Sequence, residues 1–376
     1  MFRNILSILL LLITLQLIGQ FEPITKMPEA GMDTLHSDIM NEDYYLHVTL
    51  PPMYNYQNKD YPVLYYLDAY SSAGAVNDMA IGAMAVKEIE DVIMVGISYK
   101  VSPMFFQQKR IRDYIPPIEI DDEKHRGDDF IQFMKTELIP FVDERYRTDS
   151  RTRGLVGCSY GGLITAWTLK SEPGLFNRLG IICPSLWYND ASFLSDPDVV
   201  RNIELLEDQR IFTSAGSLEH ESMISNVSKF EEILLVNQEI EVTKVIFEGE
   251  SHGSVIFPSI QRAILTLFRN EYKHLVQLAN DAYFSGDYDT ARDKRILASE
   301  TYPERVTSAL HYNLACVYAL TDDRDKSFTQ LEKLLKSRYS NYDHISTDKD
   351  FIALHGDDRW NDIMDKVKAN QEKKKK

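Results

Sequence analysis

The stretch RGLVGCSYGGLITAW, residues 153–167, decides how the rest of the chain is interpreted. An apolar run leads into the motif Gly-x-Ser-x-Gly at residues 157–161, and a helix-compatible segment follows it. A serine in this strand–turn–helix context is typical of a nucleophile elbow, a strained turn in which glycines let strand and helix approach closely. We therefore predict that Ser159 is a nucleophile. The five motif residues alone would fit an ordinary loop equally well, so the prediction depends on the rest of the chain.

Two later segments supply the other residues that a serine nucleophile needs. Residues 209–214, QRIFTS, are predicted as a strand, and Glu219 lies in the loop after it. Residues 242–247, VTKVIF, are predicted as another strand, and His252 follows it. In an α/β-hydrolase the nucleophile, acid and histidine occur in this chain order, each after a strand. We predict His252 as the general base and Glu219 as the acid that orients it, with Glu221 as the rival acid.

Strand-like and helix-like segments alternate between residues 40 and 270. Apolar residues recur at helical spacing along residues 128–142, which predicts an amphipathic helix, and a second helix is expected over 223–236. The expected strands are 43–50, 62–67, 91–98, 179–183, 209–214 and 242–247. This alternation predicts an α/β fold with a mostly parallel central sheet covered on both faces.

The segment after the expected strand 62–67 is predicted to be a loop, Asp68 to Gly74, that contributes to an oxyanion hole. In a hydrolase of this kind one backbone N–H donor comes from such a loop and the other from the residue after the nucleophile. We assign these two donors to Tyr70 and Tyr160. They would stabilise charge that appears only in the tetrahedral intermediate.

Composition and charge exclude several classes of function. The chain has 376 residues and a formal net charge of −16, so neither nucleic acid nor an anionic membrane surface is an expected partner. Its three cysteines are Cys158, Cys183 and Cys316, an odd and widely spaced set that argues against a disulfide framework. Cys158 is interpreted as a packing residue beside the nucleophile.

The first residues have the pattern of an export signal. A short basic start precedes an apolar run over residues 5–18, which is too short to span a bilayer comfortably. We interpret residues 1–19 as a signal peptide, and a retained membrane anchor is the alternative. The mature protein is then expected in the periplasm or secreted, without membrane contact once the leader is removed.

Several motifs along residues 40–270 resemble one esterase family of α/β-hydrolases, which includes esterase D, the ferric-enterobactin trilactone esterases and the feruloyl esterases. The matching pieces are YYLD (65–68), RDYIP (112–116), ELIPFV (137–142), GCSYGG (157–162), CPSLWY (183–188), GSLE (216–219) and SHG (251–253). The resemblance implies a serine hydrolase of carboxylic esters with no metal and no cofactor. A small-molecule or glycan-linked ester is the expected substrate.

This chain departs from the family pattern at two positions. The family often has histidine where this chain has Cys158, and glycine where it has Ala69. In the trilactone esterases the acid appears dispensable and a serine–histidine pair suffices, so that possibility applies to Glu219. Trp187 and Tyr188 either form a wall of the substrate pocket or pack at its rim.

Beyond residue 270 the pattern becomes helical. Residues 279–291 and 310–328 resemble tetratricopeptide repeats, with Asp322 replacing the turn glycine of the second unit. We therefore divide the chain into a leader (1–19), an esterase domain (20–270) and a tetratricopeptide-like region with a basic tail (271–376). Two repeats bury little surface alone, so the region is expected to pack on the esterase domain, dimerise or bind a protein partner.

Two other functional classes remain open at this point. The chain could be an exported adaptor whose hydrolase-like domain no longer catalyses, although every expected catalytic atom is present. The same three residues would also serve a thioesterase, an acyltransferase or a serine peptidase.

Overall fold

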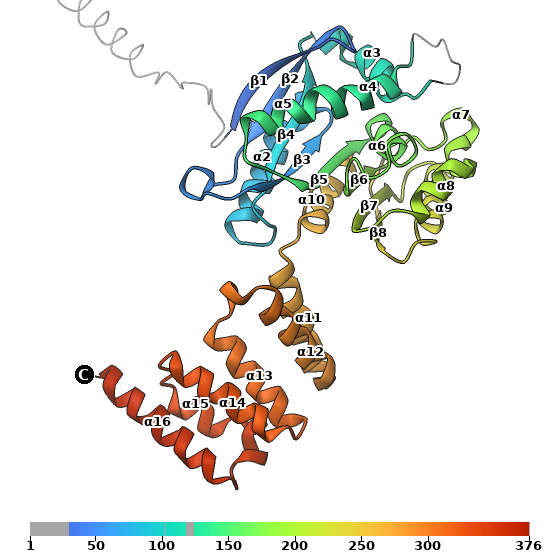
Figure 1. The fold of residues 1–376 in the computed structure, drawn as a ribbon. Helices are drawn as coiled ribbons and strands as arrows, with labels where there is room; N and C mark the ends of the chain where they lie inside the picture. Colours follow the sequence, from blue (N-terminus) through green and yellow to red (C-terminus); the bar gives the residue numbers. More distant parts are fainter. Residues whose placement is uncertain (1–29, 102, 118–123, 376) are drawn as a thin grey trace, which may run out of the picture. The chain divides into compact units, whose positions relative to one another are not determined.

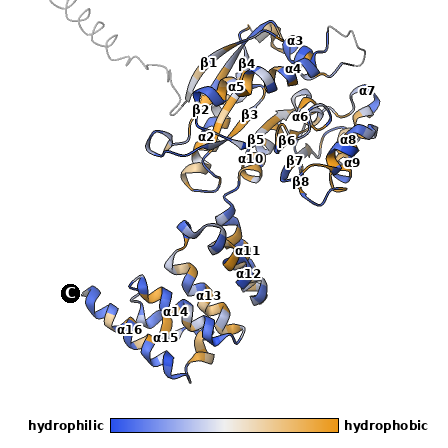
Figure 2. Ribbon diagram, in the orientation of Figure 1, coloured by the Kyte–Doolittle hydropathy of each residue, from blue (hydrophilic) through white to orange (hydrophobic). Residues whose placement is uncertain are grey.

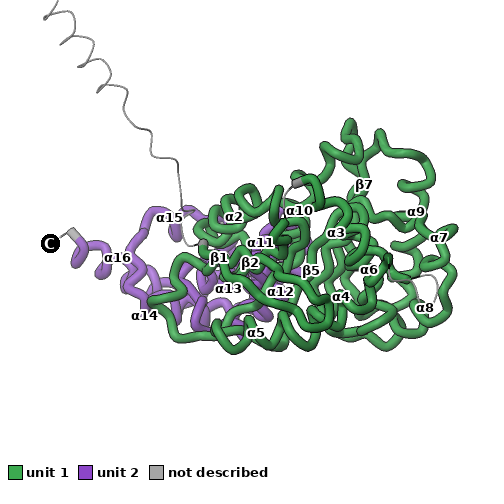
Figure 3. Tube along the Cα trace, turned by 90° about the horizontal axis from the view of Figure 1, so that it is seen from above, with its two compact units in different colours: residues 1–268 green, residues 269–376 purple. Residues whose placement is uncertain are grey.

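The computed structural model describes residues 30–101, 103–117 and 124–375. They form two compact units, of which one ends at Phe268 and the other begins at Arg269 (Figure 3). The expected leader, residues 1–19, lies outside the described residues. Within the described ranges, no helix has both the length and the apolar character needed to cross a membrane.

The first unit is built on an eight-stranded sheet with the order β1-β2-β4-β3-β5-β6-β7-β8 (Figure 1). β2 pairs antiparallel with β1 and β4, whereas every other neighbouring pair is parallel. The strands are Ala30–Ser37 (β1), Glu42–Thr49 (β2), Tyr61–Tyr66 (β3), Ile93–Tyr99 (β4), Thr148–Cys158 (β5), Arg178–Ile182 (β6), Gln209–Gly216 (β7) and Ile240–Phe247 (β8). The predicted fold class, an α/β-hydrolase fold with a mostly parallel sheet, is confirmed.

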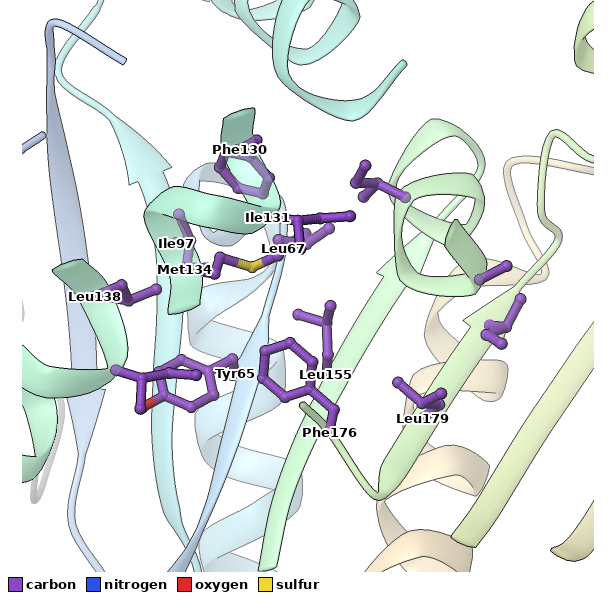
Figure 4. Close-up of a cluster of buried hydrophobic side chains, with 14 of the residues drawn as sticks. Tyr65, Leu67, Ile97, Phe130, Ile131, Met134, Leu138, Leu155, Phe176 and Leu179 are labelled. Atoms are coloured by element: carbon purple, nitrogen blue, oxygen red, sulfur yellow. The ribbon is translucent and has the colours of Figure 1, made fainter. Parts of the chain in front are cut away.

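Burial of the sheet on both faces explains its apolar strands. Successive side chains of a strand point to opposite faces, and in β3 the side chain of Tyr65 joins one buried cluster while Leu64 and Tyr66 join the other. Figure 4 shows the first cluster, where Tyr65 lies beside Leu155 and Phe176. Figure 2 accordingly shows hydrophobic residues, coloured orange, along the strands.

Helices cover the two faces. On one face, α2 (Ala69–Ala85) packs against β4 and α10 (Ile256–Leu267) packs against β5, β6 and β7. On the other, α6 (Tyr160–Ser171) packs against β5 and β6, and α9 (Glu221–Leu234) against β7 and β8. The remaining helical segments are η1 (Tyr54–Tyr56), α3 (Pro103–Tyr114), α4 (Gly127–Phe133), η2 (Met134–Leu138), α5 (Ile139–Arg145), α7 (Tyr188–Ala191), η3 (Ser192–Ser195) and α8 (Pro197–Glu204). The helix predicted over residues 128–142 is present but contains a π-helical turn, η2.

The second unit is entirely helical. It contains α11 (Glu271–Ser285), α12 (Tyr288–Thr301), η4 (Pro303–Arg305), α13 (Ser308–Leu320), α14 (Arg324–Lys336), α15 (Tyr342–Thr347), η5 (Lys349–Leu354) and α16 (Asp358–Lys375). α11 pairs with α12, and α13 pairs with α14. Their connecting turns match in conformation, because Gly286 and Asp322 both have positive φ, at 84° and 59°. The helical region is therefore confirmed, while its likeness to tetratricopeptide repeats stays a prediction.

Candidate active site

Ser159 lies at a strained turn between β5 and α6. Strand β5 ends at Cys158, helix α6 begins at Tyr160, and the serine between them has φ 59° and ψ −115°. A residue with a Cβ rarely adopts positive φ, and such strain concentrates at functional sites. The backbone therefore has the geometry expected of a nucleophile elbow.

The glycines of the motif are required by close backbone approach. A Cβ on Gly157 would lie 2.2 Å from the carbonyl oxygen of Gly161. A Cβ on Gly162 would lie 2.8 Å from the carbonyl oxygen of Ile182. Both contacts are with backbone atoms, which cannot turn aside as a flexible side chain would. Strand and helix meet this closely only because these two positions lack side chains.

The structure brings the three predicted catalytic residues into one hydrogen-bonded chain. His252 Nε2 lies 3.1 Å from Ser159 Oγ, and His252 Nδ1 lies 2.9 Å from Glu219 Oε2. The second carboxylate oxygen of Glu219 accepts a hydrogen bond from the backbone N–H of Gly216, at 2.9 Å. The Glu219 side chain is fully buried, whereas the His252 side chain is 43% exposed. The acid is therefore fixed by the end of β7, and the histidine bridges it to the serine.

The hydrogen-bonding capacities of these groups assign the protons. A carboxylate only accepts hydrogen bonds, so Nδ1–H of His252 donates to Glu219. The Nε2 atom of that tautomer is an acceptor, so the Ser159 hydroxyl donates to it. This is the arrangement in which the imidazole can take up the serine proton.

The structure separates the rival acid from the three residues and places beside Ser159 a residue that the sequence did not single out. The rival acid Glu221 is exposed at the first turn of α9, and no described contact joins it to His252. Ser185, which follows β6, places its Oγ 3.4 Å from Ser159 Oγ. Because the serine proton is directed to His252, the Ser185 hydroxyl is the donor in this long contact. Its position in the motif CPSLWY was the only sequence signal for it.

Tyr70 and Tyr160, assigned as oxyanion donors, both lie in the first turn of a helix. The segment expected as a loop from Asp68 to Gly74 is in fact helical from Ala69 onward, which corrects that part of the prediction. The first N–H groups of an α-helix have no partner within it, so the N–H of Tyr160 in α6 and of Tyr70 in α2 can serve an external acceptor. The two helix ends also carry partial positive charge, which favours an anion.

An ion pair that no local sequence pattern predicts links the residue before α2 to helix α3. The carboxylate of Asp68 contacts the guanidinium of Arg110, with Oδ1 to Nε at 2.6 Å and Oδ2 to Nη2 at 2.8 Å. Burial raises the pKa of Asp68, and Arg110 opposes that rise. The partners are 42 residues apart, and no local pattern links them.

The two aromatic residues proposed for the pocket differ in environment. Trp187 is 44% exposed, and its ring lies 6.3 Å from the ring of Tyr160, so it is beside the elbow. The hydroxyl of Tyr188 donates to the carbonyl of Pro116 at 3.5 Å, and its ring packs on the first core cluster. Whether either residue contacts substrate stays a prediction.

A further set of atoms could hold a metal in principle. Donor atoms of Cys183, Glu219 and His252 lie within 4.8 Å of one another. Burial, with the nearby Glu219 charge, raises the pKa of the Cys183 thiol to about 12, which disfavours the thiolate that a metal would need. The hydrogen bond between Glu219 and His252 already accounts for their proximity.

Together, the sheet and the serine–histidine–carboxylate chain at the ends of its strands define an α/β-hydrolase. The chain belongs to a known family within that class. Residues 37–254, more than half of the chain, match the family described as "Putative esterase". Membership of this family identifies the protein as an ester hydrolase.

Two curated relatives and one solved structure are similar to this chain. Ferri-bacillibactin esterase BesA of Bacillus subtilis (strain 168) is 26% identical over 236 residues, covering 57% of this chain and 81% of BesA. Apo-salmochelin esterase of Escherichia coli is 24% identical over 225 residues, covering 55% of this chain and 69% of that protein. The solved structure of an IroE-like serine hydrolase from Shewanella oneidensis has a TM-score of 0.57 and 20% identity, covering 82% of this chain and 99% of its own. That last likeness shows the shared fold.

Proposed function

We propose that this protein is a serine esterase that cleaves carboxylic esters through Ser159, His252 and Glu219 and an acyl-enzyme intermediate. The observation that carries the proposal is the hydrogen-bonded chain from Ser159 Oγ through the imidazole to a fully buried carboxylate. A serine hydroxyl is a weak nucleophile, and an adjacent base is the usual means of activating it.

The first half of the reaction forms the acyl-enzyme. Ser159 Oγ attacks the ester carbonyl carbon while its proton passes to His252 Nε2, and Glu219 stabilises the imidazolium. The carbonyl oxygen becomes an oxyanion that accepts hydrogen bonds from the N–H groups of Tyr160 and Tyr70. The tetrahedral intermediate then expels the alkoxide, which takes the proton from His252 and leaves as the alcohol.

The second half returns the enzyme to its resting state. Water attacks the acyl carbonyl carbon and gives its proton to His252 Nε2. The second intermediate collapses, Ser159 recovers that proton, and the carboxylic acid is released. Every transferred proton is therefore carried by His252 Nε2. The buried Glu219 side chain holds the imidazole in orientation through Nδ1.

We propose a siderophore ester as the substrate class. The support is that similar proteins are named for siderophore esters, namely ferri-bacillibactin and apo-salmochelin. The glycan-linked esters expected from the sequence are the alternative class. The two classes are distinguished by direct assay.

The first experiment measures hydrolysis of p-nitrophenyl esters of increasing acyl length by residues 20–376. Ser159→Ala should lower kcat by about 10⁴-fold or more, because it removes the nucleophile. Ser225→Ala, which deletes an exposed hydroxyl on α9, is the matched control and should retain full activity. A fluorophosphonate probe should label wild-type Ser159 and leave Ser159→Ala unlabelled. Equal activity of Ser159→Ala and wild type would exclude the proposed nucleophile.

Substrate class is tested by competing ferri-bacillibactin with an acetylated xylan oligosaccharide and a feruloyl ester. The proposal expects kcat/KM for the siderophore to exceed the others by at least about 10²-fold, equivalent to about 3 kcal/mol of transition-state binding. Preference for either sugar-linked ester would reject the siderophore class while leaving the chemistry intact.

We also propose that the protein is exported with removal of its leader. The support is the short basic start and apolar run of residues 1–18. N-terminal sequencing of protein recovered from the periplasm or medium should begin at about residue 20. A chain that retains Met1 in the membrane fraction would support the anchor alternative.

A further inference from the structure

Asp68 begins helix α2 with a side chain that does not cap it. The residue is in the left-handed region, at φ 59° and ψ 33°, and its carboxylate makes no hydrogen bond to the helix. An aspartate at this position commonly accepts from the first N–H groups of the helix. Here both carboxylate oxygens are held by Arg110 of α3 instead. The negative charge is therefore kept near the start of α2, where it satisfies none of the helix N–H groups.

The same ion pair also touches the nucleophile elbow. Arg110 Nη2 lies 3.3 Å from the carbonyl oxygen of Cys158, the residue before the nucleophile. A Cβ on Gly161, in the first turn of α6, would lie 3.6 Å from Asp68 Oδ2. The side chains of Asp68 and Arg110 are only 16% and 12% exposed, so water screens their charges weakly. The carboxylate thus lies close to both helix ends that we propose as oxyanion donors.

We propose that Arg110 is a positioning residue that neutralises the Asp68 carboxylate beside the oxyanion site and fixes the start of α2 against the elbow. The proposal rests on the proposed function, because the oxyanion forms only during ester cleavage. An uncompensated carboxylate near the donors would oppose the negative charge that develops on the carbonyl oxygen. A guanidinium in bidentate contact cancels that opposition. Arg110 therefore acts through Asp68 and need not touch the substrate.

This role predicts an asymmetry between the two partners. Arg110→Gln leaves the carboxylate uncompensated, so kcat should fall about 10²-fold with KM changed less than about threefold, comparable to losing an oxyanion donor. Asp68→Asn removes the opposing charge, and kcat should fall by less than about tenfold. The double variant should therefore recover at least about tenfold in kcat over Arg110→Gln.

The experiment measures kcat and KM of the full mature chain on a p-nitrophenyl ester. It also measures inhibition by an aryl trifluoromethyl ketone, whose adduct with the serine carries an oxyanion. Its Ki should rise in parallel with the fall in kcat/KM. Arg153→Gln is the matched control, since Arg153 forms a similarly buried ion pair with Asp143 at 2.6 Å without contacting Asp68 or the elbow. This control should keep its kcat.

Breaking a buried ion pair can destabilise the fold, so thermal unfolding of each variant is recorded. If Arg110→Gln does not fold, Arg110→Lys and the double variant provide the test. Arg110→Lys keeps the positive charge but loses the planar guanidinium that contacts both carboxylate oxygens, so a loss of about tenfold in kcat is expected.

Each remaining outcome overturns the proposal. A rise in KM at unchanged kcat would make Arg110 a substrate contact. Equal losses in Arg110→Gln, Asp68→Asn and the double variant would make the pair a structural link only. Unchanged kcat in a folded Arg110→Gln variant would exclude a positioning role for Arg110. Failure of the proposed function itself is distinct, because the wild type would then neither turn over esters nor react with the fluorophosphonate.

Discussion

Two glutamates two residues apart have opposite environments, and this difference is the reason that we propose Glu219 as the acid. Glu219 is fully buried against His252 and the N–H of Gly216, whereas Glu221 is exposed at the start of α9. An amide at position 219 would present the wrong hydrogen-bonding pattern to Nδ1–H and favour the inactive tautomer.

Glu219→Gln should therefore lower kcat by about 10⁴-fold, the loss seen when a buried triad carboxylate becomes an amide. Glu221→Gln is the matched control and should keep wild-type activity. Steady-state hydrolysis of a p-nitrophenyl ester measures both. Wild-type kcat in Glu219→Gln would show that the serine–histidine pair suffices, as the family resemblance left open.

Cys158 and Cys183 should be unreactive in the folded protein. Burial raises the pKa of Cys183 to about 12 and that of Cys158 well above its usual range, so little thiolate exists at pH 8. Iodoacetamide at pH 8 should leave both thiols unmodified and the esterase activity unchanged, as measured by mass spectrometry and hydrolysis. In urea both thiols should react. Labelling of native Cys158 with loss of activity would contradict its interpretation as a packing residue.

At the scale of single elements, the elbow depends on glycine for close packing. Gly157→Ala would place a methyl group 2.2 Å from a backbone oxygen, so the strand and helix would have to separate. We expect a loss of about 1–3 kcal/mol in the free energy of unfolding, with a fall in kcat as Ser159 is displaced. Urea unfolding and ester hydrolysis measure the two effects.

Gly82→Ala supplies the control for that substitution. Gly82 lies in α2, and a Cβ there would meet nothing within 4 Å. The change should stabilise the protein by about 0.5–1 kcal/mol, because glycine is unfavourable in a helix. An equal loss of stability in both variants would show that close packing is not the reason for glycine at position 157.

The parts of the fold that sequence could predict are those with strong local patterns. Strands β3, β4, β6 and β7 have near-continuous apolar runs because both of their faces are buried, and their expected bounds were close to those observed. Strand β5 is longer than the apolar run that predicted it, because its first residues are polar and partly exposed. Strand β1 was missed, since its residues AGMDTLHS at the sheet edge lack such a run. The helical state of Ala69 onward was also missed, because helix α2 begins with small residues and no side-chain cap.

The same reasoning explains which site residues could be predicted. Ser159, Glu219 and His252 each follow a strand, so the Gly-x-Ser-x-Gly motif and the order of the strands were enough to propose them, with Glu221 left as the rival acid. Arg110 is in a helix that the local pattern did not connect with the site, and only the packed fold brings it to Asp68. Arg112 and Asp113 of the RDYIP motif form an ion pair, with Arg112 Nε 2.5 Å from Asp113 Oδ1.

At the scale of the whole molecule, each unit has a hydrophobic core of its own. Leu331 is fully buried in the core of the helical unit, while Leu155 is fully buried in β5, the strand that ends at the elbow. Leu331→Ala should destabilise the helical unit by about 2–5 kcal/mol and leave ester hydrolysis unchanged. Leu155→Ala should affect hydrolysis as well. Calorimetry with parallel activity assays checks both, and loss of hydrolysis in Leu331→Ala would show that the units fold cooperatively.

The protein partner expected for the helical region stays a prediction. That unit has a hollow of about 580 Å³ whose lining includes Tyr283, Phe284 and Tyr312. Phe284 is 84% exposed, which makes it the first residue to substitute when a partner is sought.

The mostly parallel sheet places the proposed catalytic residues and Asp68 at the carboxyl ends of its strands. Asp68, Ser159, Glu219 and His252 follow the carboxyl ends of β3, β5, β7 and β8, while the cores lie along the strands. Loops at that edge can therefore lengthen, shorten or change composition without altering the residues that determine stability. In evolutionary terms, a lineage built on this fold can explore new esters by loop variation while inheriting its chemistry and its robustness unchanged.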